Sequence, residues 1–272
     1  MATIGALSGL RDRPIEGVEA SRELKQGFRS HPIEVAGPGH NEPLVDVRDY
    51  GVAGENYYFA ERNPPYWQRI KGAIPELLVR QAVAERLRRV NERLSPSHLA
   101  LHLFDGWRPR SVQAFFHDVW FPAELVRRQP DLSGDALTFE VERYWSAPTE
   151  NPQSPAPHAT GAAVDLTLRW MGADPLWMGS IFDDVTPLAH RDRFETGDER
   201  LLSFSDTEAR ANRRLLHWVM IEEGFVGDPD EWWHYSWGDQ MWAKAVGAPE
   251  ALYGLIEPTG GARRGPAIPL TP

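Results

Sequence analysis

The segment 155–165 constrains the fold of this sequence more than any other stretch. Its prolines predict a turn that presents His158, and Gly161 allows the backbone to pass close to other segments. From about residue 164 to residue 170 apolar and polar side chains alternate, which predicts a strand with Asp165 at its head. A histidine and a carboxylate held on a strand and its approach loop form half of a candidate metal site.

A second histidine, His234, ends the run Glu-Trp-Trp-His that begins at Glu231. Residues 232–237 are rich in aromatic side chains, which favours a strand over a helix. Side chains three residues apart on a strand point to opposite faces, so Glu231 is predicted in the preceding turn, leaning over the pocket that His234 faces. This placement indicates a catalytic or supporting carboxylate rather than a ligand.

Two histidines and one carboxylate give a zinc ion three protein ligands and leave a fourth position for water, which is typical of a catalytic site. Zinc lowers the pKa of a bound water to roughly 7, and a nearby glutamate can take the remaining proton. Arg108 lies in a Gly-Trp-Arg-Pro turn at the end of a predicted strand. It is the candidate cation for stabilising an oxyanion.

Each of these patterns also has a purely structural interpretation. The His158 segment alone matches an ordinary turn and strand, the tryptophans beside His234 fit a packed core, and Arg108 alone fits a surface salt bridge. The remaining histidines are predicted to be surface or satisfied core residues: His31, His40, His98, His102, His117, His190 and His217.

The composition limits what such a site can use. The sequence has no cysteine, which excludes disulfides, thiolate zinc sites and cysteine nucleophiles, so a metal must be held by His, Asp and Glu. Its formal net charge of -10 argues against nucleic acid or an anionic membrane as a partner, since both need a cationic surface. At 272 residues and 42% hydrophobic, the chain is long enough to bury a sizeable core.

The two ends of the sequence are predicted to be extensions. Residues 1–30 mix charged and small residues without sustained periodicity, which predicts a poorly ordered extension or a strap over the domain. The N-terminus lacks the basic start and long apolar core of a secretory signal, and no stretch reaches the length of a membrane span. We therefore predict a cytoplasmic protein with its main domain over 31–250 and a tail over 251–272.

The other periodic segments predict helices mixed with short strands. A helix that opens at Pro75 carries an apolar stripe, and a strand from His98 to Phe104 follows it. A capping box from Ser205 to Glu208 opens a later helix that Gly224 ends. A helix that follows Pro109 is predicted to bury Val112, Phe115, Phe116 and Val119. Strand and helix do not alternate strictly, so we predict an α+β domain with helices packed on a mainly antiparallel sheet.

Several blocks of the sequence carry a family pattern in a fixed order from about residue 105 to 234. Two of them are the segment from His158 through Asp165 to Leu168 and the run from Glu231 to His234. The others are Asp105–Pro109, Met178–Asp183, Asn212–Leu215 and Gly224–Phe225. Together they resemble the zinc-dependent D-alanyl-D-alanine dipeptidases of VanX type. The resemblance implies the compact fold shared by zinc D-Ala-D-Ala peptidases and the hedgehog signalling domain.

The resemblance also implies a role for each site residue. It implies that the zinc is held by His158, Asp165 and His234. Glu231 would be the general base, Arg108 would stabilise the transition state, and Asp183 would receive the free ammonium of a small D,D-dipeptide. One departure concerns the serine that the family usually has two residues before the first ligand, because this chain has Ala156 there. That change affects substrate recognition rather than the metal.

Three functions fit these expectations. The first is a zinc dipeptidase for D-alanyl-D-alanine or related D,D-dipeptides, and residues 106–157 and 171–205 are long enough to roof such a small site. The second is a peptidoglycan D,D-carboxypeptidase or endopeptidase of the same fold with a more open cleft. The third is a non-catalytic, zinc-containing binding domain. Glu231 and Arg108 argue against the third, since a structural zinc site needs neither.

Overall fold

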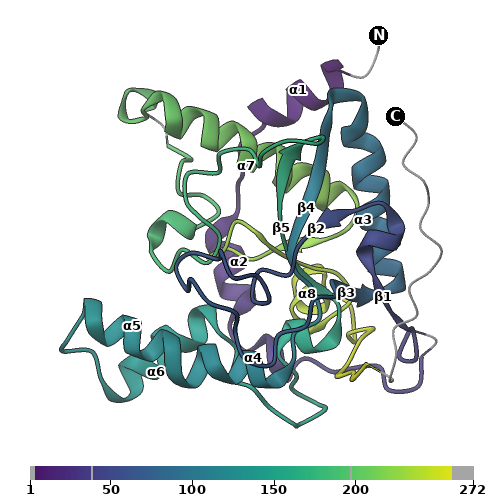
Figure 1. The fold of residues 1–272 in the computed structure, drawn as a ribbon, viewed down its shortest axis with the longest axis vertical. Coiled ribbons are helices and arrows are strands. Elements are labelled where there is room, and N and C mark those ends of the chain that lie inside the picture. The colour runs from purple at the N-terminus through teal and green to yellow at the C-terminus, as the bar shows by residue number, and fades with distance from the viewer. Residues whose placement is uncertain (1–3, 38, 197, 259–272) are drawn as a thin grey trace.

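The computed structural model describes residues 4–37, 39–196 and 198–258, and a five-stranded sheet lies at its centre (Figure 1). In spatial order its strands are β2 (Ala53–Gly54), β4 (Leu99–Asp105), β5 (Ala163–Trp170), β7 (His234–Ser236) and β6 (Val226–Gly227). β2 runs parallel to β4, and the other neighbouring pairs are antiparallel. The prediction of a mainly antiparallel sheet is confirmed.

Helices and a small second sheet surround this centre. In the second sheet β1 (Leu44–Asp46) pairs antiparallel with β3 (Leu78–Arg80). The α-helices are α1 (Ile4–Asp12), α2 (Val18–Lys25), α3 (Gln81–Leu94), α4 (Arg110–Ala114), α5 (Phe121–Arg128), α6 (Gly134–Tyr144), α7 (Phe204–Glu222) and α8 (Gln240–Val246). Helix α3 contacts β4 and helix α7 contacts β5, whereas α4, α5 and α6 lie together at the bottom of Figure 1. The α+β class is thus confirmed.

Short helical turns complete the chain. A π-helix, Phe115–Trp120, continues α4 into α5. The 3₁₀ helices are η1 (Phe28–Ser30), η2 (Val47–Tyr50), η3 (Ser95–Ser97), η5 (Pro157–Thr160), η6 (Pro187–Ala189) and η7 (Glu199–Leu201). None of the helices in the described ranges combines the length and apolarity that a bilayer crossing needs.

The two central strands bury different amounts of side chain. β4 buries Leu99, Leu101 and Leu103 and leaves the residues between them half-buried, as its alternating sequence predicts. β5 lies between β4 and β7, and residues 163–168 are all buried because both of its faces are covered. Asp165 therefore sits on a backbone that the core holds rigidly.

Two helix predictions need correction. The helix expected to open at Pro75 begins at Gln81, because residues 78–80 pair with β1 before the helix starts. Val119 was expected on the buried side of the next helix, but it is 59% exposed, whereas Phe116 is fully buried. The π-helix widens the turn there, which moves Val119 away from the core.

The N-terminal stretch is helical rather than irregular. Helix α1 packs along α7, and Leu7 and Leu10 join the main core. Arg11 of α1 donates from Nη1 to Oδ1 of Asn212 at 2.7 Å. Helix α2 packs against α8 (Figure 1). Most of the predicted C-terminal tail, residues 259–272, lies outside the described residues.

The N-cap of α7 is Ser203, two residues before the serine that the sequence pattern indicated. Its side chain accepts from the backbone N–H of Asp206, and the Asp206 carboxylate accepts from the backbone N–H of Ser203. The helix begins at Phe204, so Ser205 falls inside its first turn. The end of the helix before Gly224 is as predicted.

We expect Ser203→Ala to lower the free energy of unfolding by about 1 kcal/mol, because it removes the N-cap. Ser205→Ala is the matched control and leaves stability nearly unchanged, since Ser205 is exposed and caps nothing. Urea unfolding of both variants measures the difference. Equal losses from the two substitutions would contradict this assignment of the cap.

Candidate metal centre and active site

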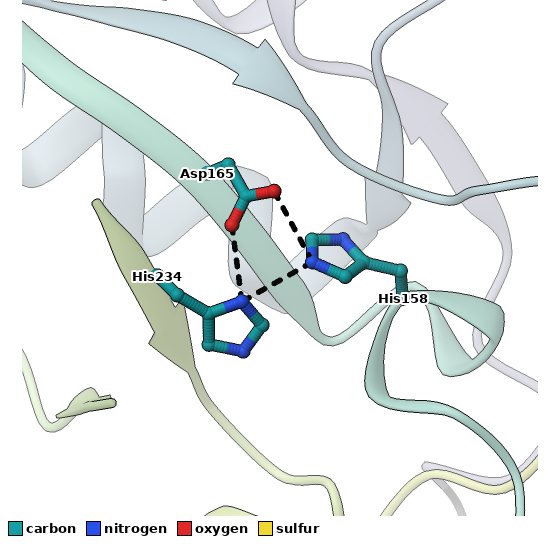
Figure 2. A group of neighbouring side chains, drawn as sticks. All are labelled: His158, Asp165 and His234. Atoms are coloured by element: carbon teal, nitrogen blue, oxygen red, sulfur yellow. Dashed lines mark hydrogen bonds and ion pairs between the residues drawn. The ribbon is translucent and has the colours of Figure 1, made fainter. Parts of the chain in front are cut away.

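His158, Asp165 and His234 converge at the head of β5, and we call them the metal triad (Figure 2). Asp165 on β5 is the register partner of His234 on β7, and His158 comes from η5 just before β5. His234 Nδ1 lies 3.0 Å from Asp165 Oδ1 and 3.2 Å from His158 Nε2. All three side chains are buried, and their donor atoms lie within 4.8 Å of one another.

The opposite ring nitrogens of the two histidines have fixed partners. Nδ1 of His158 lies 2.8 Å from the carbonyl oxygen of Gly106, which can only accept, so this nitrogen carries the proton. Ser236 Oγ donates to Asp239 Oδ2 at 2.7 Å, and His234 Nε2 lies 3.5 Å from that hydroxyl oxygen. These partners leave the lone pairs of His158 Nε2 and His234 Nδ1 facing each other. Such an arrangement fits a cation between them.

The third member of the triad is anionic. Burial alone would raise the pKa of Asp165, but His158 and His234 hold that pKa below its usual range. Its Oδ2 also accepts from Arg108 Nη2 at 3.1 Å. A donor set of two imidazoles and one buried carboxylate matches what zinc takes in sites with an open position.

Arg108 is buried beside the triad and most of its N–H groups are committed. Nε donates to Asp105 at 2.8 Å, Nη1 donates to Gln113 at 2.9 Å, and Nη2 donates to both Asp165 and Tyr58. Burial lowers its pKa, but Tyr58, Asp105 and Asp165 outweigh that effect and raise it. One N–H of Nη1 has no partner within the described residues, so it can meet a ligand.

Glu231 lies in the turn before β7, where the sequence placed it. Its Oε2 is 3.8 Å from His234 Nδ1, and its carbonyl accepts from the backbone N–H of His234. Burial, followed by the charge of Asp228, raises the pKa of Glu231 well above its usual value. The pocket therefore holds a carboxylate with enhanced affinity for a proton beside the triad.

Asp183 lines the same pocket and is held by two tyrosines. The hydroxyls of Tyr58 and Tyr66 donate to its Oδ2 at 2.9 and 2.8 Å. Its Oδ1 has no hydrogen-bond partner in the part of the chain that the structure describes. Burial, followed by the charge of Asp165, raises the pKa of Asp183 to about 7.

The structure brings together all six residues that the sequence singled out. They share one pocket, whose other walls are Lys25, Phe28, Gln113, Glu142, Arg143, Tyr144, Trp145, Ser146, Pro157, Asp228, Trp233 and Met241. The sequence missed Tyr58, Tyr66, Asp239 and Lys25. For Ser236 a signal existed, since a residue two positions after His234 on a strand shares its face. His190 lies beside Arg143 and Asp230 instead, outside the triad.

Comparison with known sequences gives the family. The model of peptidase family M15, described as D-ala-D-ala dipeptidase, matches residues 69–248. This chain belongs to that family. It is therefore a peptidase, and the residues that carry the metal triad all lie within the matched region.

Individual relatives bear the same name. A D-alanyl-D-alanine dipeptidase of Synechocystis is 35% identical over 228 residues, which is 78% of this chain and 87% of that protein. One from Streptomyces coelicolor is 32% identical, covering 57% of this chain and 71% of its own. The solved structure of the LdcB LD-carboxypeptidase aligns with 84% of this chain and 86% of its own at 14% identity, with a TM-score of 0.40.

Asp183 is expected to make the stability of the metal-free protein depend on pH. Its folded pKa of about 7 exceeds the usual 3.8, so the folded state binds this proton more tightly than the unfolded state. The resulting stabilisation is fully present below pH 3.8 and is lost as the pH rises through about 7. Urea unfolding after chelation should show a steeper decline in the wild type than in Asp183→Asn, in which the raised pKa of Glu231 still makes stability fall as the pH rises. Parallel pH profiles for the two proteins would contradict the assignment.

Proposed function

We propose that this peptidase is a zinc-dependent dipeptidase that hydrolyses D-alanyl-D-alanine, or a closely related D,D-dipeptide, to free amino acids. The observation that carries the proposal is the meeting of the metal triad with Glu231, Arg108 and Asp183 in one pocket. A structural metal site needs none of these three. A hydrolase needs a proton acceptor, a cation for the oxyanion and an anchor for the substrate.

The metal triad would hold the zinc ion. Bound there, zinc would supply a Lewis acid that polarises the scissile carbonyl and lowers the pKa of water at the site to about 7. Gly106 and Ser236 orient the two imidazoles from behind, so that both rings present a lone pair to the ion. The burial of the triad excludes competing bulk water from the ligands.

Glu231 acts as the general base. A carboxylate oxygen takes the proton of the attacking water and then delivers it to the amide nitrogen of the leaving amino acid. The raised pKa of Glu231 suits this double role, because the group must accept a proton readily and hold it until the bond breaks. Arg108 directs its uncommitted Nη1–H at the oxygen on which negative charge develops.

Asp183 receives the ammonium group of the dipeptide on Oδ1, since its Oδ2 is already bonded to Tyr58 and Tyr66. A peptide with a blocked amino terminus would leave this buried carboxylate unpaired, which costs binding energy. Ala156 has no hydroxyl to offer the carboxyl end of the substrate. We therefore expect the enzyme to accept several D,D-dipeptides in addition to D-alanyl-D-alanine.

Glu231→Gln should lower the turnover of D-alanyl-D-alanine by about 100-fold or more, because the general base is lost. The variant should still bind one zinc ion per chain, because Glu231 is not a ligand. Metal analysis and amino-acid release on a panel of D,D-, L,D- and L,L-dipeptides measure both effects. Glu142→Gln is the matched control, since Glu142 lines the same pocket without a proposed role. If the zinc-loaded wild type hydrolyses no D,D-dipeptide, the proposal fails and a binding domain becomes the better interpretation.

The anchoring role of Asp183 separates a dipeptidase from a carboxypeptidase or endopeptidase. We expect Asp183→Asn to lower kcat/KM for the free dipeptide by about tenfold or more, because a charged hydrogen bond to the ammonium is lost. N-acetylated D-alanyl-D-alanine should be a poor substrate of the wild type. Asp184→Asn is the control, since that side chain accepts hydrogen bonds from Thr186 and does not line the pocket. Efficient cleavage of the acetylated peptide would favour the peptidoglycan peptidase instead.

A further inference from the structure

Part of the pocket wall comes from the N-terminal stretch, which precedes the family's matched region of 69–248. Lys25, the last residue of α2, and Phe28 of η1 both line the pocket that holds the metal triad. The contacts of Lys25 show what it contributes.

The Lys25 ammonium is surrounded by oxygen atoms of the chain. Nζ donates to the carbonyl of Arg143 at 2.8 Å, lies 2.8 Å from Oδ2 of Asp228, and lies 3.4 Å from Oδ2 of Asp230. An ammonium group has three N–H donors, and these partners use all of them. Lys25 is therefore committed to the protein and has no donor left for a substrate carboxylate.

The two aspartates belong to the turn that carries Glu231. Oδ1 of Asp228 accepts from the backbone N–H of Asp230 at 2.8 Å, and the backbone N–H of Asp228 donates to the carbonyl of His234 at 2.9 Å. These bonds close a loop from Asp228 to His234, with Glu231 in its middle. The orientation of Glu231 therefore depends on the conformation of this loop.

The loop contains buried negative charge that needs compensation. Asp228 and Asp230 are 4% and 3% exposed. Asp230 also pairs with Arg22 at 3.2 Å and with Arg143 at 2.9 Å. For Asp228, Lys25 is the one lysine or arginine within ion-pair distance among the residues that the structure describes. Without Lys25, Asp228 would be a buried, uncompensated carboxylate that favours moving toward water.

We propose that Lys25 is a positioning residue for the general base: by neutralising Asp228 it holds the turn that directs Glu231 into the pocket. This inference rests on the proposed role of Glu231. It extends the active site to a helix outside the region that the family model matches. A displacement of about 1 Å at a catalytic group can cost roughly 100-fold in rate, so a modest shift of the turn is sufficient to matter.

The test is Lys25→Met in the zinc-loaded, full-length enzyme. The charge of Lys25 also lowers the pKa of Glu231, so kcat is compared at the pH optimum of each variant. We expect kcat to fall there by at least about tenfold while KM stays within about threefold and the zinc content is unchanged, because the base is displaced and the substrate contacts remain. Adding Asp228→Asn removes the uncompensated charge and keeps the Oδ1 acceptor of the turn. The double variant should regain kcat to within about threefold of the wild type.

Arg22→Met is the matched control. It removes a cation from Asp230 without touching Asp228, and Arg22 does not line the catalytic pocket. Its kcat should stay within about twofold of the wild type, as is usual for one ion pair among several around the same carboxylate.

Three results would overturn the inference. One is an unchanged kcat in Lys25→Met. Another is a loss that falls on KM instead of kcat, which would mean that Lys25 contacts the substrate. The third is a folded, zinc-loaded double variant that stays as slow as Lys25→Met. If Lys25→Met does not fold, Lys25→Gln takes its place, since it keeps a donor for the Arg143 carbonyl. A failure of the proposed function is distinct, because it would appear as an inactive wild type.

Discussion

Arg108 lies buried between Asp105 and Asp165, and the geometry of the pocket depends on this arrangement. The two aspartates are register partners on β4 and β5, so their carboxylates enter the same buried region from adjacent strands. Removing one partner from a buried ion pair costs about 3–5 kcal/mol, because a charge is left without compensation. Arg108 thus allows Asp165 to remain anionic inside the core, and within the described residues one N–H of its Nη1 still has no partner.

The parts of the site that the sequence predicted are those that local rules determine. His158 and Asp165 are close in sequence, and a Pro-rich turn followed by an alternating strand places both at one end of β5. Side chains alternate between the two faces of a strand, so His234 and Glu231, three residues apart, could not share one face. This argument assigned Glu231 to the preceding turn. The mainly antiparallel sheet was predicted because short strands and helices do not alternate strictly along the sequence. The pairing of Asp165 with His234 completes the triad. The ligand chemistry of the two histidines and the aspartate had already suggested that these distant segments meet, and the family resemblance implied the same three residues.

The parts that the sequence did not predict depend on contacts between distant segments. Tyr58 reaches Asp183 across 125 residues, and Lys25 reaches Asp228 across 203 residues, so no local period marks either of them. Val119 was misplaced because a π-helix is not visible in a hydrophobic pattern that assumes an α-helical period. Helix α2 escaped detection because it is held largely by charged side chains, including Arg22 and Lys25, rather than by a regular apolar stripe.

Two cations that line the pocket, the buried Arg108 and the half-buried Lys25, serve different acidic groups. Arg108 compensates Asp165 in the metal triad, whereas Lys25 compensates Asp228 in the turn. In the part of the chain that the structure describes, no lysine or arginine lies within ion-pair distance of Glu231, whose nearest basic group is His234. A cation bonded directly to Glu231 would lower its pKa and weaken it as a proton acceptor. Burial and the charge of Asp228 raise the pKa of Glu231 by more than the charge of Lys25 lowers it. Under the proposed roles, pairing Lys25 with Asp228 rather than with Glu231 holds the turn in place while the Glu231 carboxylate stays basic. In the proposed mechanism, this division of charge accounts for Lys25 of α2 lining the same pocket as Glu231.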